Sequence, residues 1–307
     1  MDKLPVSALR GLIDKQKRYE LIFIVLGVVA LSIGVLTFLA LFVDMILDGY
    51  SRLSPEFFTN FPSRRAANAG ILSAWVGTCL VMLVTAFVAV PIGVAAGIYL
   101  EEYAPKHWIT DVIEINISNL AGVPSIIYGL LALGLFVYVF GLGQSILTAG
   151  LTLALLILPI VIVATREAIR TIPGVIREGA YALGATKWQC VQHHVLPYSF
   201  PGILTGVIIG MARAIGETAP IITIGALTFI AFLPPAPVQA TVPFVNFEWL
   251  WAPFTVMPIQ IFNWTSRPQE AFQANAAAAG FVLVIMTLSM NAVAIYLRYR
   301  LRRNIKW

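Results

Sequence analysis

Six long apolar runs constrain this chain more than any other feature of its sequence. Each run has at least about the 20 residues that a helix needs to cross the hydrocarbon core of a membrane, with few or no charges. None shows the alternation of polar and apolar residues that is typical of membrane β-strands. The sequence therefore predicts an all-α membrane protein with six transmembrane helices, at approximately residues 21–43, 69–100, 115–140, 145–165, 203–231 and 276–297.

The composition agrees with a membrane protein. Hydrophobic residues make up 59% of the 307 residues and charged residues only 11%, whereas soluble domains carry about 25% charged residues. The first apolar run follows a basic segment and is longer than the apolar region of a signal peptide, which has about 7–15 residues. The sequence shows no obvious cleavage site of small residues. We therefore expect this run to be an uncleaved first helix.

The basic residues predict the orientation, because loops rich in Lys and Arg stay on the cytoplasmic side of a membrane. With the N-terminus inside, 15 of the 20 Lys and Arg residues fall on that side: five before the first run, Lys106, four within residues 166–200, and five after residue 297. Both termini are expected to be cytoplasmic. Topology anchoring of this kind explains the net charge of +5 without a nucleic-acid partner.

The cysteines and histidines predict neither a disulfide nor a metal site. Cys79 falls inside an apolar run and Cys190 in a cytoplasmic loop, so the two are separated. His193 and His194 are adjacent and lack partners at the spacing of metal ligands.

The chain is expected to form one bundle, because most of its connections are short. A cytoplasmic segment (1–20) precedes the six-helix transmembrane domain (21–297), and a basic cytoplasmic tail (298–307) follows it. Two loops are long. The cytoplasmic loop 166–200 has helical spacing and Pro/Gly punctuation, which predicts a pair of short surface helices, and the outer loop 232–275 holds seven prolines and three tryptophans. We expect the outer loop to be ordered against the membrane interface or a partner.

Proline interrupts four of the predicted helices, at Pro91, Pro124, Pro159 and Pro220. Each proline removes a backbone donor that lipid cannot replace, so neighbouring helices or an aqueous cavity must compensate. Two interpretations stay open for each position: an ordinary kink in a packed bundle, or a broken helix of a transport pathway.

Arg213 and Glu217 stand four residues apart within the fifth apolar run. A charge at the centre of a membrane costs at least about 2.5 to 3.5 kcal/mol, so such residues face protein or water. At about 100° per residue, the pair shares a helix face with three glycines, a pattern that lets another helix approach closely. The pair either neutralises itself or presents a guanidinium to an oxyanion. The packing glycines are Gly202, Gly206 and Gly210.

The cytoplasmic loop contains a spaced motif. Glu178-Gly179-Ala180 is followed after three residues by Gly184, and after nine more by His194 and then Leu196-Pro197. This resembles the EAA loop of ABC-importer permeases, with Gly179 in place of an alanine and His194 in place of an isoleucine. The resemblance implies a type I (MetI-like) six-helix bundle with cytoplasmic coupling helices. It also implies the residues that dock on an ATPase subunit: Glu178, Gly179, Ala180, Gly184, Leu196 and Pro197.

Two further segments, residues 121–130 and 213–220, are similar to the phosphate-uptake (Pst) permeases. The ending Glu-Thr-Ala-Pro at 217–220 and the stretch 290–303 resemble the A-type subunit of that family. The resemblance implies that Arg213, Glu217 and Thr218 line an anion path. Arg166 is a second candidate, although basic residues at its position also serve topology.

The resemblance implies transport of inorganic phosphate across a bacterial cytoplasmic (inner) membrane by alternating access. The partners would be a C-type permease in a heterodimer, two copies of a phosphate-importer ATPase and a periplasmic phosphate-binding protein. The chain has no Gly-x-x-x-x-Gly-Lys-Ser/Thr phosphate loop. We therefore expect it to be no enzyme and to bind no cofactor, with ATP and Mg²⁺ used by the partner ATPase.

Two alternatives remain open at this point. An arginine does not choose among tetrahedral anions, so the chain fits an ABC permease for molybdate or sulfate as well. A buried ion pair within six spans also fits an ion-coupled secondary transporter, although the EAA spacing argues against it.

Overall fold

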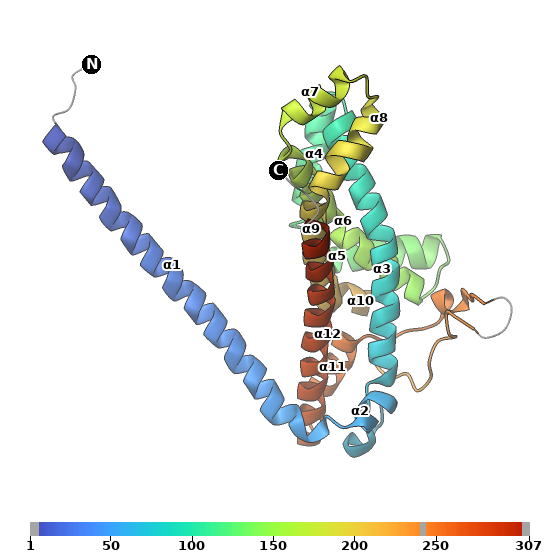
Figure 1. Ribbon diagram of the computed structural model, residues 1–307. Helices are drawn as coiled ribbons and strands as arrows, with labels where there is room; N and C mark the ends of the chain where they lie inside the picture. Colours follow the sequence, from blue (N-terminus) through green and yellow to red (C-terminus); the bar gives the residue numbers. More distant parts are fainter. Residues whose placement is uncertain (1–5, 240–243, 303–307) are drawn as a thin grey trace.

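Helices make up nearly all of the regular structure in the computed structural model, which describes residues 6–239 and 244–302 (Figure 1). Five helices in this part of the chain are long and apolar enough to cross a membrane. They are α1 (Val6–Gly49), α3 (Leu72–Ile98), α6 (Ile146–Arg170), α9 (Leu196–Gly216) and α12 (Glu270–Arg302). The prediction of an all-α membrane protein is confirmed, since the same residues contain no β-strand and only one isolated bridge, between Val238 and Val245.

Shorter helices connect the long ones. The α-helices are α2 (Pro55–Thr59), α4 (Trp108–Leu120), α5 (Ser125–Ala132), α7 (Gly174–Ala182), α8 (Lys187–Cys190), α10 (Ala219–Thr223) and α11 (Met257–Thr265). Three π-helical segments are η3 (Tyr99–Tyr103), η4 (Leu133–Val139) and η5 (Val191–Val195). Three 3₁₀ turns are η1 (Tyr50–Arg52), η2 (Ala66–Asn68) and η6 (Glu248–Trp251).

The third predicted span is broken at Pro124, which is one of the two interpretations left open for that position, and counting the bent pair as one span gives six candidate membrane spans within residues 6–239 and 244–302. The segments Trp108–Leu120 and Ser125–Val139 meet at an angle of 104°. Pro124 has no backbone N–H and disfavours helical geometry in the residue before it, while Gly122 adds conformational freedom. We call this bend, residues 121–124, the elbow.

The fifth predicted span also ends early. A helix over residues 203–231 was expected, but α9 ends at Gly216, and Glu217 has an extended backbone with φ −75° and ψ 129°. Pro220 cannot donate a hydrogen bond to the carbonyl of Gly216, which favours a break there. The short helix α10 follows. By contrast, Pro91 and Pro159 lie inside α3 and α6, which continue through them.

The core of the bundle is α6, with α3 and α9 packed against it. The predicted packing glycines face α6: a Cβ at Gly202 would lie 2.6 Å from the Cβ of Ala168, and Gly206 lies against Ala164. Gly210 lies beside Ile157 at ordinary van der Waals distance. The absence of a side chain at Gly206 is therefore what allows α9 to lie so close to α6.

The helix α1 leaves the bundle, and only its last part lies near α12 (Figure 1). In its most apolar stretch none of the residues is buried. The start of α1 and the end of α12 lie toward the same end of the molecule as α7 and α8 (Figure 1). The described parts of the predicted terminal segments, residues 6–20 and 298–302, continue these two helices, and residues 1–5 and 303–307 lie outside the description.

The close approach of α6 and α9 predicts the effect of a single methyl group. Gly206→Ala forces its Cβ against Ala164 and should destabilise the protein by about 1 to 3 kcal/mol, the usual cost of overpacking. Gly34→Ala in α1 is the matched control, because no atom lies within 4 Å of its added Cβ. Thermal unfolding of the purified protein in detergent checks this, and a Gly206→Ala variant as stable as Gly34→Ala would contradict the packing.

Candidate functional site

Arg213 lies in the last turn of α9 and links two breaks in the membrane helices. Its Nε donates to Glu217 Oε1 at 3.3 Å, beyond the end of α9. Its Nη1 donates to the carbonyl of Ala121 at 3.5 Å, in the elbow between α4 and α5. The side chains of Arg213 and Glu217 are 34% and 18% exposed. The predicted pair is therefore brought together, with its guanidinium between the end of α9 and the elbow.

The elbow is held by side chains that bind the last carbonyls of α4. Tyr128, on α5, donates its hydroxyl to the carbonyl of Leu120 at 2.8 Å, next to the Ala121 carbonyl that Arg213 binds. The C-terminal carbonyls of a helix carry partial negative charge, which favours a cation there. The guanidinium thus faces two kinds of acceptor, a carboxylate and a backbone carbonyl.

Glu217 and Thr218 point into different hollows. Glu217 lines a small hollow together with Thr78 and Leu153. Thr218 lines a groove with Pro258 and other residues of α10, α11 and α12. The structure therefore joins Glu217 with Arg213 but places Thr218 on another side of the break.

Arg166 lies at a different level of the bundle from Arg213. It is 13 residues further along α6 than Leu153, about 20 Å at 1.5 Å per residue. Its side chain is 6% exposed, and its Nη2 lies 2.6 Å from Glu114 Oε1 and 3.4 Å from Glu101 Oε2. Its buried Nε has no hydrogen-bond partner. Arg166 therefore forms ion pairs with Glu101 and Glu114 and does not lie beside Arg213.

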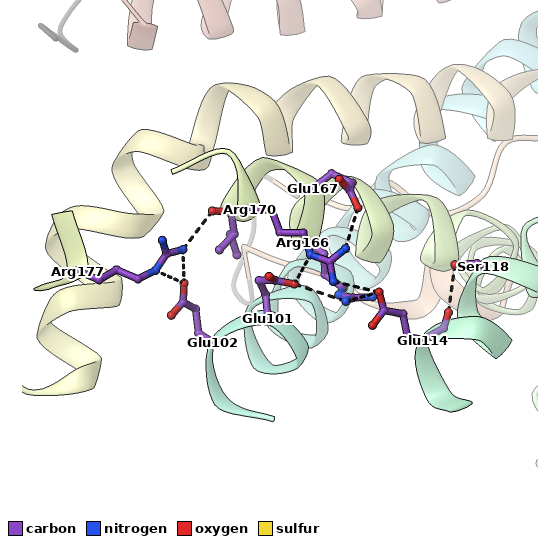
Figure 2. A network of polar contacts seen from close by, with 9 residues as sticks. Glu101, Glu102, Glu114, Ser118, Arg166, Glu167, Arg170 and Arg177 are labelled. Carbon is purple, nitrogen blue, oxygen red and sulfur yellow. Dashed lines mark hydrogen bonds and ion pairs between the residues drawn. The ribbon is translucent and has the colours of Figure 1, made fainter. Parts of the chain in front are cut away.

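These contacts belong to a charge network that the sequence analysis missed (Figure 2). Arg170 binds the same two carboxylates as Arg166, and Arg177 binds Glu102. The only signal in the sequence is that charges of opposite sign stand at the ends of successive apolar runs. That signal does not say which of them pair.

The loop 166–200, which was predicted to be cytoplasmic, forms the expected pair of short helices, α7 and α8. After α7 the chain turns at Gly184, whose φ of +82° strains any residue with a side chain. The helix α8 then begins with a capping box between Thr186 and Gln189. The turn through η5 leads into α9 at Leu196.

The motif residues of this loop divide into exposed and buried positions. Glu178, Gly179, Gly184 and Pro197 are exposed, and Leu196 is half-buried. Ala180 is buried in a small cluster that ties α7 to the end of α6. At the position where the EAA pattern has isoleucine, His194 is exposed, and its neighbour Val195 is buried instead.

Large apolar side chains are exposed on these short helices. Leu183 is 91% exposed, in the turn between α7 and α8. Exposed apolar groups that gather on one surface mark an interaction site. The others are Val175, Tyr181 and Trp188.

The elbow predicts a role for the Tyr128 hydroxyl. Tyr128→Phe removes a partly buried hydrogen bond to the Leu120 carbonyl, which keeps the Val123 N–H as a donor, and should lower stability by about 0.5 to 1.5 kcal/mol, the usual net contribution of one hydrogen bond. Tyr138→Phe, at an exposed position of the same segment, is the control and should have no effect. The two melting temperatures in detergent decide the matter, and equal values would show that the hydroxyl does not hold the elbow.

Comparison with known proteins places this geometry in a family. Residues 89–307 match the family described as binding-protein-dependent transport system inner membrane component. The chain is 33% identical to the probable ABC transporter permease protein YqgI of Bacillus subtilis (strain 168), over 84% of this chain and 87% of that protein. It is 30% identical to the phosphate transport system permease protein PstA of Yersinia pestis, over 89% and 88%. The resemblance to ABC-importer permeases is confirmed.

Solved structures share the fold. A chain of a bacterial ABC transporter involved in the import of the acidic polysaccharide alginate superposes with a TM-score of 0.60 at 15% identity, over 96% of this chain and 99% of that one. A chain of the MetNI methionine ABC transporter gives a TM-score of 0.57 at 17% identity, over 74% and 93%. With the family match over residues 89–307, we conclude that the chain belongs to the binding-protein-dependent transport system inner membrane components.

Proposed function

We propose that this chain is the A-type permease subunit of an ATP-driven importer that carries inorganic phosphate across the bacterial cytoplasmic membrane. Its relatives include phosphate transport system permease proteins of several bacteria. The segments 121–130 and 213–220, which carry the resemblance to phosphate permeases, meet in space where Arg213 contacts Ala121.

The observation that supports the proposal most directly is that the Arg213 guanidinium is accessible and only weakly hydrogen-bonded. It is partly exposed, and its contacts of 3.3 and 3.5 Å are long for hydrogen bonds of this type. The planar fork of an arginine matches an oxyanion and binds it with two donors. A phosphate oxyanion that reaches Arg213 therefore replaces weak contacts with strong ones.

In this proposal Glu217 stabilises the charge of Arg213 while no anion is bound. A lone guanidinium within a membrane is costly, and a carboxylate nearby reduces that cost while no anion is bound. Because a phosphate and the Glu217 carboxylate repel each other, the anion should displace the carboxylate rather than join it. In the proposal Thr218 lines the path beyond this point, while Arg166 acts through the charge network at the other end of α6.

The energy is proposed to come from a separate ATPase, in two copies that bind ATP and Mg²⁺. The exposed face of α7 and α8, with Glu178 and Leu183, is the surface proposed to dock on it. Movement of that face would tilt α6 and α9 and alternate the access of the site. A periplasmic phosphate-binding protein would deliver the anion at the end of the molecule opposite to α7 and α8.

A second permease subunit of the C type is proposed to cover the open apolar surface. The side chains of α1 between Leu21 and Val43 are exposed or only half-buried. An apolar groove of about 690 Å³ between α3, α9 and α12 is also open, lined by Met82, Met211 and Phe281 among others. Both termini are proposed to lie in the cytoplasm, since α1 starts and α12 ends at the α7–α8 end of the molecule (Figure 1).

Substitution of Arg213 tests the anion path. Arg213→Gln should reduce phosphate uptake by about 10- to 100-fold, because it removes charged hydrogen bonds to the anion. Uptake of radiolabelled phosphate is measured with excess sulfate or molybdate, in cells whose only A-type permease is this chain. Arg64→Gln, at an exposed position between α2 and η2, is the control. Wild-type uptake by Arg213→Gln would refute the role of Arg213 in the anion path, and absence of phosphate uptake by an assembled wild-type complex would exclude phosphate as the substrate.

The docking surface is tested by reversing the charge of Glu178. Glu178→Lys should reduce transport-coupled ATP hydrolysis several-fold, while the chain still inserts into the membrane. Glu56→Lys, an equally exposed acidic position on α2, should leave hydrolysis unchanged. The measurement is ATP hydrolysis by the purified complex, normalised to the amount of permease, and wild-type hydrolysis in Glu178→Lys would refute docking through this residue.

A further inference from the structure

Three arginines and three glutamates join four structural elements at the α7–α8 end of the molecule (Figure 2). Glu101 and Glu102 are on η3 and Glu114 is on α4, whereas Arg177 is on α7. The other two arginines, Arg166 and Arg170, are on the last turns of α6. We refer to these six residues as the charge network.

Four of them form a closed ring. Arg170 donates to Glu101 Oε2 at 2.9 Å and to Glu114 Oε1 at 3.0 Å. Arg166 lies against the same two oxygen atoms, at 3.4 and 2.6 Å. Each carboxylate is therefore shared by two guanidinium groups, so η3, α4 and α6 are held in one arrangement. Removing one charge leaves the buried Arg166 poorly compensated.

Arg177 connects this ring to the proposed docking surface. Its Nη2 and Nε lie 2.7 and 2.9 Å from Glu102 Oε1, and the Glu102 side chain is only 8% exposed. The same guanidinium donates to the carbonyls of Ile169 and Ile172, at the end of α6. The Arg177 side chain thus joins α7 both to η3 and to the end of α6, beside the apolar cluster around Ala180.

The other side of the ring leads to the elbow. Glu114 lies in the middle of α4, which has 13 residues and spans about 20 Å. The carbonyls at the end of α4 are those of Leu120 and Ala121, which Tyr128 and Arg213 bind. Because a helix moves as a stiff rod, a displacement of Glu114 also displaces the Ala121 carbonyl relative to Arg213.

We propose that the charge network transmits the movement of α7 to the elbow, and so sets how strongly the Ala121 carbonyl holds Arg213. Arg177 and Glu102 are positioning residues in this proposal, which rests on the proposed function of the chain. The geometry of the network supports the proposal, because each of its ion pairs joins two different elements and together they link α7, η3, α4 and the end of α6.

The test uses the whole complex, with its partner permease, ATPase and phosphate-loaded binding protein, reconstituted in lipid vesicles. The variants are Glu102→Gln, Arg177→Gln and the double variant. The ratio of stimulated to basal ATP hydrolysis should fall by about 2- to 30-fold in each single variant, the usual range for residues that carry coupling. The double variant should fall no further than the worse single one, because the two residues act as a unit.

Two further variants separate coupling from folding. Glu114→Gln breaks the ring without touching α7 and should lower the same ratio. Glu167→Gln is the matched control: its carboxylate also binds Arg170, but it is 65% exposed and lies on α6 itself, so it joins no second element. It should keep the wild-type ratio. Co-purification of the ATPase with each variant measures assembly.

Three results would overturn the proposal. Wild-type ratios in Glu102→Gln and Arg177→Gln would show that the network carries no coupling. Equal losses of basal and stimulated hydrolysis, together with loss of the bound ATPase, would show a purely structural role. A wild-type complex that phosphate-loaded binding protein does not stimulate would overturn the proposed function itself, and this result is recognisable before any variant is made.

Discussion

The structure depends on how the elbow between α4 and α5 satisfies its backbone. Lipid offers no hydrogen bonds, so a helix that breaks at membrane depth must find partners for its last carbonyls within the protein. Tyr128 supplies one for Leu120, and Arg213 supplies one for Ala121. Arg213 therefore has a structural duty as well as the proposed contact with an anion. Because α9 ends at Gly216, Arg213 lies in the last turn of this helix. Glu217 follows with an extended backbone, and its carboxylate accepts a hydrogen bond from the Arg213 guanidinium.

The approximate positions of the apolar spans were predictable from the sequence, but the ends of the helices and their breaks were not. Four prolines stood out equally, yet α3 and α6 run through Pro91 and Pro159, while the chain bends before Pro124 and Pro220. The difference lies in the residues just before each proline. One of the four residues before Pro124 is Gly122, and one of the four before Pro220 is Gly216. The four residues before Pro91 (87–90) and before Pro159 (155–158) contain no glycine. Loss of a donor bends a helix most where the backbone is also freest.

Some of the ion pairs were predictable from the sequence and others were not. Arg213 and Glu217 were predictable as a pair from their spacing of four residues, although in the structure Glu217 lies just beyond the end of α9 and not within a continuous helix. The charge network was not, since its pairs are separated by 52 to 75 residues along the chain. Only the packing of η3 and α4 beside the end of α6 brings them together. The prediction of Arg166 as a second candidate for the anion path rested on its charge alone, and the ion pairs of Arg166 with Glu101 and Glu114 could not be read from the sequence.

The two duties of Arg213 have a thermodynamic consequence within the proposed function. One guanidinium cannot bind a phosphate, Glu217 and the Ala121 carbonyl equally well, so anion binding and the position of the elbow must influence each other. Such coupling is reciprocal: if movement of α7 changes the affinity of Arg213 for the anion by some factor, the anion changes the equilibrium of α7 by the same factor. A permease that responds to its ATPase in this way must also report to that ATPase whether its site is filled.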